Sequence, residues 1–130
     1  MLHALRYLWA LPASLVGSLL ALPALATGAT VRRIEGTLEI AGPPLDWAVA
    51  RLPAGMHFSA ITFGHVIIGR DHAALARCRA HERVHVAQYE RWGALLLVLY
   101  PLSSLVELLR GRHPYRDNVF EREAFDRSER

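Results

Sequence analysis

The sequence contains no lysine, and all 15 of its basic residues are arginines. After residue 30 these arginines alternate with aspartate and glutamate and form no basic run. A nucleic-acid-binding surface is therefore not expected, despite an isoelectric point near 9.6. Cys78 is the only cysteine, which excludes an intrachain disulfide and a cysteine-based zinc site. Any metal ion would have to be held by histidine, aspartate or glutamate.

Charged side chains are also missing between Arg6 and Arg32. About 20 apolar residues suffice to cross a bilayer as a helix, so this run predicts a single N-terminal anchor in the cell membrane. A secretory signal peptide is the alternative, with export after cleavage near Ala26 in the A-x-A-like stretch 24–26. The length of the run favours the retained anchor. The positive-inside rule slightly favours a cytoplasmic C-terminal part, and it leaves the side of the membrane open.

Two segments between the apolar run and residue 70 have the character of strands. Residues 33–40 alternate polar and apolar side chains, which predicts one half-buried strand with Gly36 as a bulge. Residues 58–69 are rich in β-branched and aromatic side chains, which predicts a second, mostly buried strand. In it, Gly64 would permit close backbone approach, and His65 is interpreted as a strand histidine with a local partner. A short helix is expected between the two strands, with Asp46 as a cap.

Residues 72–92 have the composition of a helix, with Asp71 as its N-cap and Gly93 as its stop. This helix carries the motif H-E-x-x-H at His81, Glu82 and His85. Residues four apart are neighbours on a helix, so the two histidines can offer their ring nitrogens to one ion. Glu82 lies beside them and could accept a proton from water. The pattern predicts a zinc site, because zinc needs such ligands and one further protein ligand.

The third ligand is not a nearby histidine, since positions 88 and 91 are glutamine and arginine. A downstream carboxylate is the other solution, and the stretch 116–127 offers Glu121 and Glu123. A short helix capped by Asp117 or Asn118 would point these two carboxylates in different directions, so that only one reaches the metal.

The apolar segment 94–109 decides whether that site can exist. If it crossed a membrane, the histidines and Glu121 would lie on opposite sides and could not share an ion. The zinc hypothesis therefore requires a non-spanning segment, which would be either a hairpin dipping into one leaflet or a packed helix pair broken at Pro101.

These motifs resemble a known class of enzymes. "HERVH" followed, after an apolar insertion, by "FEREAFD" is similar to gluzincin-type membrane metallopeptidases, such as the heat-shock membrane proteases and the CAAX prenyl endopeptidases. The chain also resembles small bacterial membrane-associated proteins of this gluzincin-like kind over about residues 60–126. The resemblance implies that His81, His85 and Glu121 are the zinc ligands, with Glu121 preferred to Glu123, and that Glu82 is the general base. Phe125 stands where the larger families have an acidic residue, and Asp126 comes one place late.

The resemblance further implies an extended polypeptide substrate, pairing with the strand within residues 60–68, and an oxyanion partner among His113, Tyr115 and Arg116. The predicted fold is α+β: a transmembrane or signal helix, a small sheet, the motif helix, a bent apolar helical segment, and a short C-terminal helix with the third ligand. Residues 1–30 would form the membrane anchor or signal segment, and residues 31–130 a minimal zincin-like metallopeptidase domain.

The expected activity is zinc-dependent hydrolysis of peptide bonds, with a membrane-proximal polypeptide as substrate and the lipid bilayer as the other partner. The alternative is a non-catalytic membrane protein that binds zinc or a protein partner through the same helix.

Overall fold

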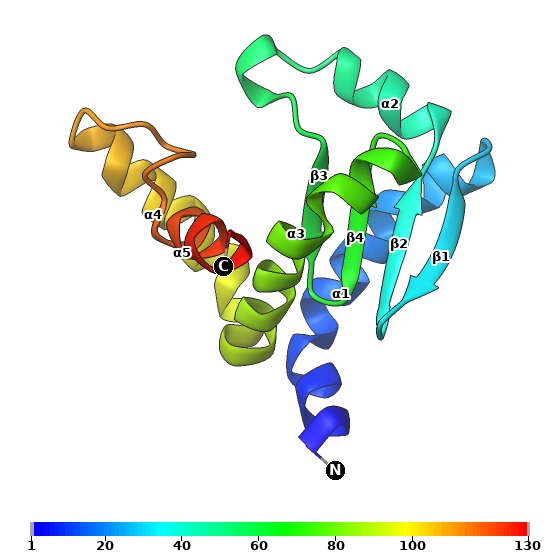
Figure 1. The fold of residues 1–130 in the computed structure, drawn as a ribbon, viewed down its shortest axis with the longest axis horizontal. Coiled ribbons are helices and arrows are strands. Elements are labelled where there is room, and N and C mark those ends of the chain that lie inside the picture. The colour runs from blue at the N-terminus through cyan, green and yellow to red at the C-terminus, as the bar shows by residue number, and fades with distance from the viewer. Residues whose placement is uncertain (1, 130) are drawn as a thin grey trace.

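The computed structural model describes residues 2–129, and it is an α+β fold with a mixed four-stranded sheet between helices (Figure 1). The motif helix α3 covers one face of the sheet, and the N-terminal helix α1 lies behind the other. Helices α4 and α5 extend to one side of this unit. In chain order the elements are α1 (Leu2–Ala26), β1 (Thr30–Ile34), β2 (Thr37–Ala41), α2 (Pro43–Ala50), the 3₁₀ turn η1 (Ala54–Met56), β3 (Ala60–Phe63), β4 (Val66–Gly69), α3 (His72–Trp92), the 3₁₀ turn η2 (Gly93–Leu95), α4 (Leu96–Leu109) and α5 (Val119–Ser128).

The prediction of one strand over residues 33–40 is wrong, because the chain reverses inside it. β1 and β2 form an antiparallel hairpin, with Ile34 opposite Thr37. Glu35 and Gly36 at the turn have φ angles of 50° and 81°. Positive φ at both central residues is the requirement of type I′ hairpin turns, whose twist matches that of the strands they join. Gly36 is therefore a turn residue and not a bulge.

The second predicted strand is also a hairpin. β3 and β4 pair antiparallel, and β4 pairs in parallel with β2, so that the sheet order is β1-β2-β4-β3. The chain turns at Gly64, whose φ is 63°. A Cβ atom there would lie 2.6 Å from the backbone nitrogen of Ser14 and 2.9 Å from the carbonyl oxygen of Ala10. The close backbone approach predicted at Gly64 is thus confirmed, and the approaching segment is α1.

Helix α1 packs against the sheet through its small side chains. The helix is apolar, and by length and composition it could cross a membrane as an anchor or serve as a signal sequence. Its buried positions recur every three or four residues and form one face. These positions are Ala10, Ala13, Gly17, Ala21 and Ala24. Two of the three hydrophobic clusters of the core contain residues of α1, so the helix and the sheet share one interior.

Helix α3 has the bounds predicted from the sequence, His72–Trp92. The Asp71 side chain accepts a hydrogen bond from the backbone nitrogen of Ala74 at 2.6 Å, as an N-cap does. The prediction for Asp46 is wrong: α2 begins earlier, with Gly42 at its N-cap, and Asp46 instead pairs with Arg70.

The bend between α3 and α4 lies at Gly93, so the alternative of a helix pair broken at Pro101 is wrong. Gly93 has a φ of 60°, and Pro101 lies inside the continuous helix α4. The run His72–Leu109 has the length and hydropathy of a membrane span, but this turn divides it into two helices. The chain turns back after α4, over residues 110–118, and α5 packs against α3.

Candidate metal centre

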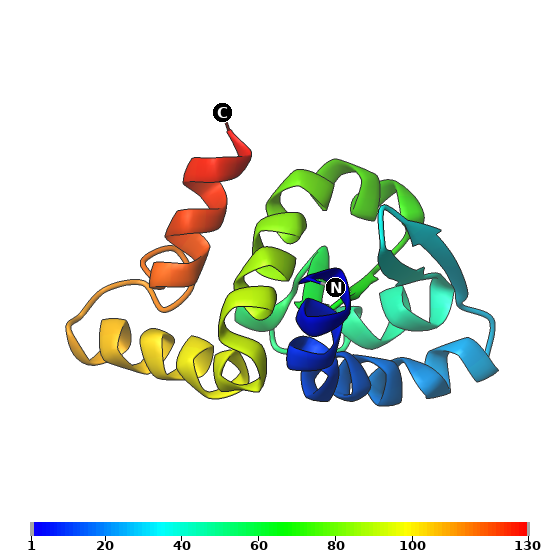
Figure 2. The ribbon, with the colours of Figure 1, turned by 90° about the horizontal axis from the view of Figure 1, so that it is seen from below.

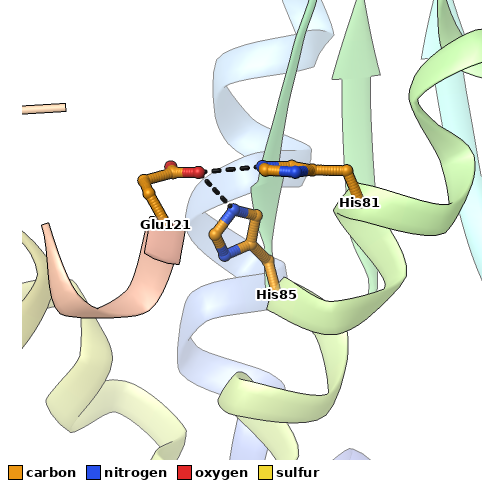
Figure 3. Close-up of side chains that lie close together, drawn as sticks. All are labelled: His81, His85 and Glu121. Carbon is orange, nitrogen blue, oxygen red and sulfur yellow. Dashed lines mark hydrogen bonds and ion pairs between the residues drawn. The ribbon is translucent and has the colours of Figure 1, made fainter. Parts of the chain in front are cut away.

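Three potential ligands meet between α3 and α5 (Figure 3). Nε2 of His81 lies 2.8 Å from Oε1 of Glu121, and Nε2 of His85 lies 3.1 Å from the same oxygen. His85 and Glu121 are buried, and His81 is half-buried. The H-E-x-x-H spacing places both histidines on the same side of α3, and Asn118 caps α5 by accepting a hydrogen bond from the nitrogen of Phe120.

The spacing of these atoms suits a small metal ion. One ligand atom from each residue lies within 4.8 Å of the other two. Two ligand atoms bound tetrahedrally to zinc are roughly 3.3 Å apart, given bonds of about 2.0–2.1 Å. The observed separations of 2.8 and 3.1 Å are close to this value, so an ion can be held after small shifts of the side chains.

The hydrogen bonds of Gln88 indicate which nitrogen of His85 is free to bind a metal. The side-chain nitrogen of Gln88 donates to the carbonyl oxygen of Phe120 at 3.0 Å and to Glu123 at 2.8 Å. Its side-chain oxygen therefore faces Nδ1 of His85, at 2.8 Å. Nδ1 must be the donor in that bond, which leaves a lone pair on Nε2 of neutral His85. A lone pair directed at a carboxylate oxygen is favourable only with a proton or a cation between them, so this donor set fits a metal ion.

Glu121 is the carboxylate that reaches the histidines, and Glu123 is not, because Glu123 binds Gln88. The hydroxyl of Tyr100 on α4 donates to the second oxygen of Glu121. Burial by itself raises the pKa of Glu121, but the hydrogen bonds from His81, His85 and Tyr100 outweigh it and lower this pKa to about 2. Glu121 is consequently ionised at neutral pH, as a metal ligand must be.

Glu82 lies beside the cluster on α3 and is 6% exposed. One of its oxygens accepts a hydrogen bond of 2.7 Å from the hydroxyl of Thr62 on β3. Burial raises the pKa of Glu82, and the nearby His85 and the Thr62 hydroxyl offset part of that effect. A carboxylate whose affinity for a proton is raised is suited to accept one from water.

The three loop residues proposed as oxyanion partners lie in different settings. His113 is exposed, and its Nδ1 accepts hydrogen bonds from the backbone nitrogens of Tyr115 and Arg116, so its ring is used to form the turn. Arg116 is exposed to solvent. Tyr115 is 46% exposed, and its ring packs edge-on against Phe125, whose ring in turn packs against His81. Burial and the charges of Glu121 and Glu82 raise the pKa of Tyr115 to about 12. Tyr115 thus packs against a residue that contacts a histidine of the cluster.

His65 lies outside the cluster, and its partners belong to other elements, Glu90 on α3 and Tyr7 on α1. Its Nε2 is 2.9 Å from Glu90, and its ring stacks on Tyr7 with centroids 4.0 Å apart. It stands in the turn between β3 and β4 and not within a strand.

Asp126, one position after Phe125, does not take the place of the acidic residue that the larger families have at position 125. Asp126 is exposed, and the ring of Phe125 packs edge-on against His81 with centroids 4.5 Å apart. Support for the ligands comes instead from Gln88 and Tyr100, with Thr62 holding Glu82. Sequence reasoning missed all three. Only Gln88 had a local signal, because it follows His85 by three residues and so lies on the same side of α3.

Comparison with models of protein families, with curated proteins and with solved structures finds no match to this chain. The case for a metal centre therefore rests on the side chains themselves.

Proposed function

We propose that the chain is a membrane-associated zinc metallopeptidase. The observation that carries this proposal is the convergence of His81, His85 and Glu121 beside a buried Glu82. Two imidazoles and one carboxylate are the ligands of the His₂Glu zinc sites of hydrolases, which keep a fourth position open. The resemblance of "HERVH" and "FEREAFD" to the gluzincin peptidases points to the same reaction.

The roles of the side chains follow from their positions. Zinc, when bound, supplies a Lewis acid for the scissile carbonyl and for the attacking water. Glu82 accepts the proton of that water and passes it to the leaving amine, while the Thr62 hydroxyl holds its carboxylate in place. Gln88 and Tyr100 orient His85 and Glu121.

The edge of the sheet next to Glu82 is the place for a polypeptide substrate. β3 is the last strand in the sheet order and pairs only with β4 among the described strands. Thr62, the partner of Glu82, belongs to this strand. An extended peptide that adds to β3 would therefore pass beside the general base.

The first test is the metal content of the purified full-length chain, measured by mass spectrometry after exposure to zinc. We expect about one zinc per chain in the wild type, which is the stoichiometry of a single His₂Glu site. Glu121→Ala should lose it, and Glu123→Ala, the matched control, should keep it because Glu123 contacts Gln88 and not the histidines. A folded wild-type chain without zinc, or equal loss in both variants, would overturn the proposal.

The second test separates catalysis from binding. Glu82→Gln should keep zinc and lose hydrolysis of fluorescein-labelled casein by roughly 10²–10⁴-fold, the contribution of a general base.

A non-catalytic zinc-binding protein is the second candidate, favoured by one observation. The acidic residue that the larger families carry is missing at position 125, where the ring of Phe125 packs edge-on against His81 with centroids 4.5 Å apart. Wild-type chain that holds zinc at this cluster and does not cleave casein, with Glu82→Gln unchanged in every respect, would favour this candidate.

A further inference from the structure

Helix α4 has two opposite faces. Tyr100, Ser103 and Ser104 bind α5: the Tyr100 hydroxyl donates to Glu121, and the serine hydroxyls accept from the Val119 nitrogen at 3.0 Å and from the Asn118 side chain at 2.7 Å. At 3.6 residues per turn the opposite face holds an apolar stripe spaced three or four residues apart. Its members are Val98, Leu102, Leu105 and Leu109 of α4, together with Leu95 at the end of η2, and each is at least 50% exposed.

Helix α1 is built in the same way. Its alanine and glycine face packs on the sheet and α3. Opposite that face is a second apolar stripe, formed by Leu8, Leu15, Leu19 and Leu22, which are 53–65% exposed.

Both stripes lie on one side of the molecule. In Figure 2, α1 and α4 run along the same edge, with the sheet, α3 and α5 on the other side of them. Each stripe points away from the elements that its helix packs against. The two stripes together form what we call the leucine face, although their residues come from opposite ends of the sequence.

The composition of the leucine face and of its borders identifies its occupant as lipid. No charged residue occurs between Arg6 and Arg32, or between Arg91 and Glu107. Tyr7 and Trp9 are 42% and 52% exposed near the start of α1, where aromatic side chains of membrane proteins meet the headgroups. A face between two water-soluble subunits would carry a polar rim and hydrogen-bonding side chains, whereas all nine residues of the leucine face are Leu or Val. Such a face bounded by charges is typical of helices that lie on a bilayer.

Neither helix can cross the bilayer in this fold. α4 has 14 residues, which at 1.5 Å per residue span about 21 Å, less than the roughly 30 Å of a hydrocarbon core. α1 is long enough, but it is tied to the rest of the chain along its length. Trp9 donates to the carbonyl of Arg91, and Ser14 accepts from the nitrogen of His65. A spanning α1 would draw the sheet and the charged helix α3 into the hydrocarbon, where their polar groups lack partners.

We propose that the leucine face of α1 and α4 lies in the surface of a lipid bilayer, with both helices parallel to the membrane plane. The start of α1, the metal cluster and the end of α5 are then all on the same side of the membrane. This deepens the proposed function, since it would give the site access to polypeptides at that surface, but the face itself does not require a metal.

The first experiment is flotation of the full-length chain with vesicles of phosphatidylcholine and phosphatidylglycerol. The wild type should float, and the double variant Leu102→Lys with Leu105→Lys should reduce the bound fraction at low lipid by roughly tenfold or more, since each buried leucine contributes about that factor. Val31→Lys is the matched control, because Val31 is also 50% exposed but lies on β1. A wild-type chain that stays in solution as a dimer, or equal loss in the control, would overturn the proposal.

The second experiment decides between lying on and crossing the membrane. Cys78→Ala provides a background without thiols, and single cysteines replace His3, Leu19 or Glu129 in chains inserted into sealed membrane vesicles. A membrane-impermeant maleimide should label positions 3 and 129 from the same side, and position 19 only after detergent is added. Labelling of 3 and 129 from opposite sides would show that α1 spans, and loss of position 3 from the mature chain would show cleavage; either result overturns the proposal. Zinc content measured on the same samples keeps a failure of this proposal apart from a failure of the zinc site.

Discussion

Gln88 connects the histidine helix to the helix that carries the third ligand. Its side chain binds Nδ1 of His85 with its oxygen, and Phe120 and Glu123 of α5 with its nitrogen. It is 3% exposed, so none of these contacts is replaced by water when it is lost. The ring of His85 therefore depends on Gln88 for its orientation.

Gln88→Met should keep the volume of this side chain and remove its hydrogen bonds. We expect a loss of roughly 10–100-fold in zinc affinity, which is typical when a histidine ligand loses its outer partner. Competition with a chromophoric chelator measures it, and Glu123→Ala should cost less because the bond from Gln88 to Phe120 remains. Unchanged affinity in Gln88→Met would mean that His85 is oriented by packing alone.

The stability of the metal-free chain should depend on pH through His85. Burial lowers the pKa of His85, but its contacts with Glu121 outweigh burial and raise it above the ordinary 6.5. The protonated ring therefore stabilises the fold below pH 6.5, and this contribution is lost as pH rises through the raised value. Thermal unfolding with a chelator should show the melting temperature falling over that window. In His85→Phe this dependence should flatten, while His57→Phe, outside the cluster, should keep it.

Zinc should reverse this dependence. The metal needs neutral His85, so binding releases the proton and zinc affinity should rise over the same window. Isothermal titration in two buffers of different ionisation enthalpy measures the released proton. The pKa of Glu121 is lowered from 4.5 to about 2, so its ionised carboxylate stabilises the fold above pH 4.5. This contribution should be lost only as pH falls from 4.5 toward 2.

At the scale of elements, the sequence predicts helix bounds best where a capping or stop residue lies directly beside the end of the helix. Helix α3 follows from its capping Asp71 and the stop at Gly93, and α5 follows from Asn118. The pairing of His81 with His85 follows from the helical period alone, but the meeting with Glu121 was a choice between two carboxylates that only the docking of α5 on α3 resolves.

The elements that were mispredicted depend on contacts far apart in the chain. A strand and a tight hairpin share the same alternation, so periodicity over residues 33–40 could not reveal the turn at Glu35. The alternation over residues 33–40 would place Glu39 on the solvent-exposed side of a half-buried strand. Glu39 is instead buried, because Arg79, 40 residues later, binds both of its oxygens. Thr62 and Tyr100 were missed for the same reason, as each reaches the site from another element.

The contact between α1 and the hairpin of β3 and β4 can be tested at Gly64. Gly64→Ala should destabilise the fold by about 2–4 kcal/mol, because a Cβ would meet the backbone of α1 and because φ is positive. Gly111→Ala is the control: its φ is 74°, but nothing lies within 4 Å of the added Cβ, so only the cost of about 1–2 kcal/mol for the left-handed conformation remains. Chemical denaturation measures both, and equal losses would mean that α1 does not pack there.

At the scale of the whole molecule, α1 is part of the interior. Ala21 and Ala24 belong to the same buried cluster as Ile40 and Val66, and Ala10 and Ala13 to that of Tyr89 and Leu96. Removal of the helix would expose one face of the sheet to water.

A chain that lacks residues 2–26 should therefore fail to unfold cooperatively and should lose zinc together with its fold. Near-ultraviolet circular dichroism during heating measures the first effect. The intact mass of the protein from membranes should correspondingly include α1. A shortened chain with an unchanged melting temperature would show that α1 is dispensable, as a cleaved signal peptide is.

A bound ion would also cross-link α3 to α5, because its ligands come from both helices. His85 and Glu121 are 36 residues apart, and an ion shared between them closes a long loop whose opening would otherwise be entropically favourable. Withdrawal of the metal should release α5 as a unit, and trypsin should then cut faster at Arg122 and Arg127 but not at the exposed Arg51. If the cleavage rates at all three arginines stay the same, the ion does not hold α5 against α3. If cleavage at Arg122 and Arg127 becomes faster while cleavage at Arg51 does not, the supply of metal controls the resistance of the chain to proteolysis as well as its activity.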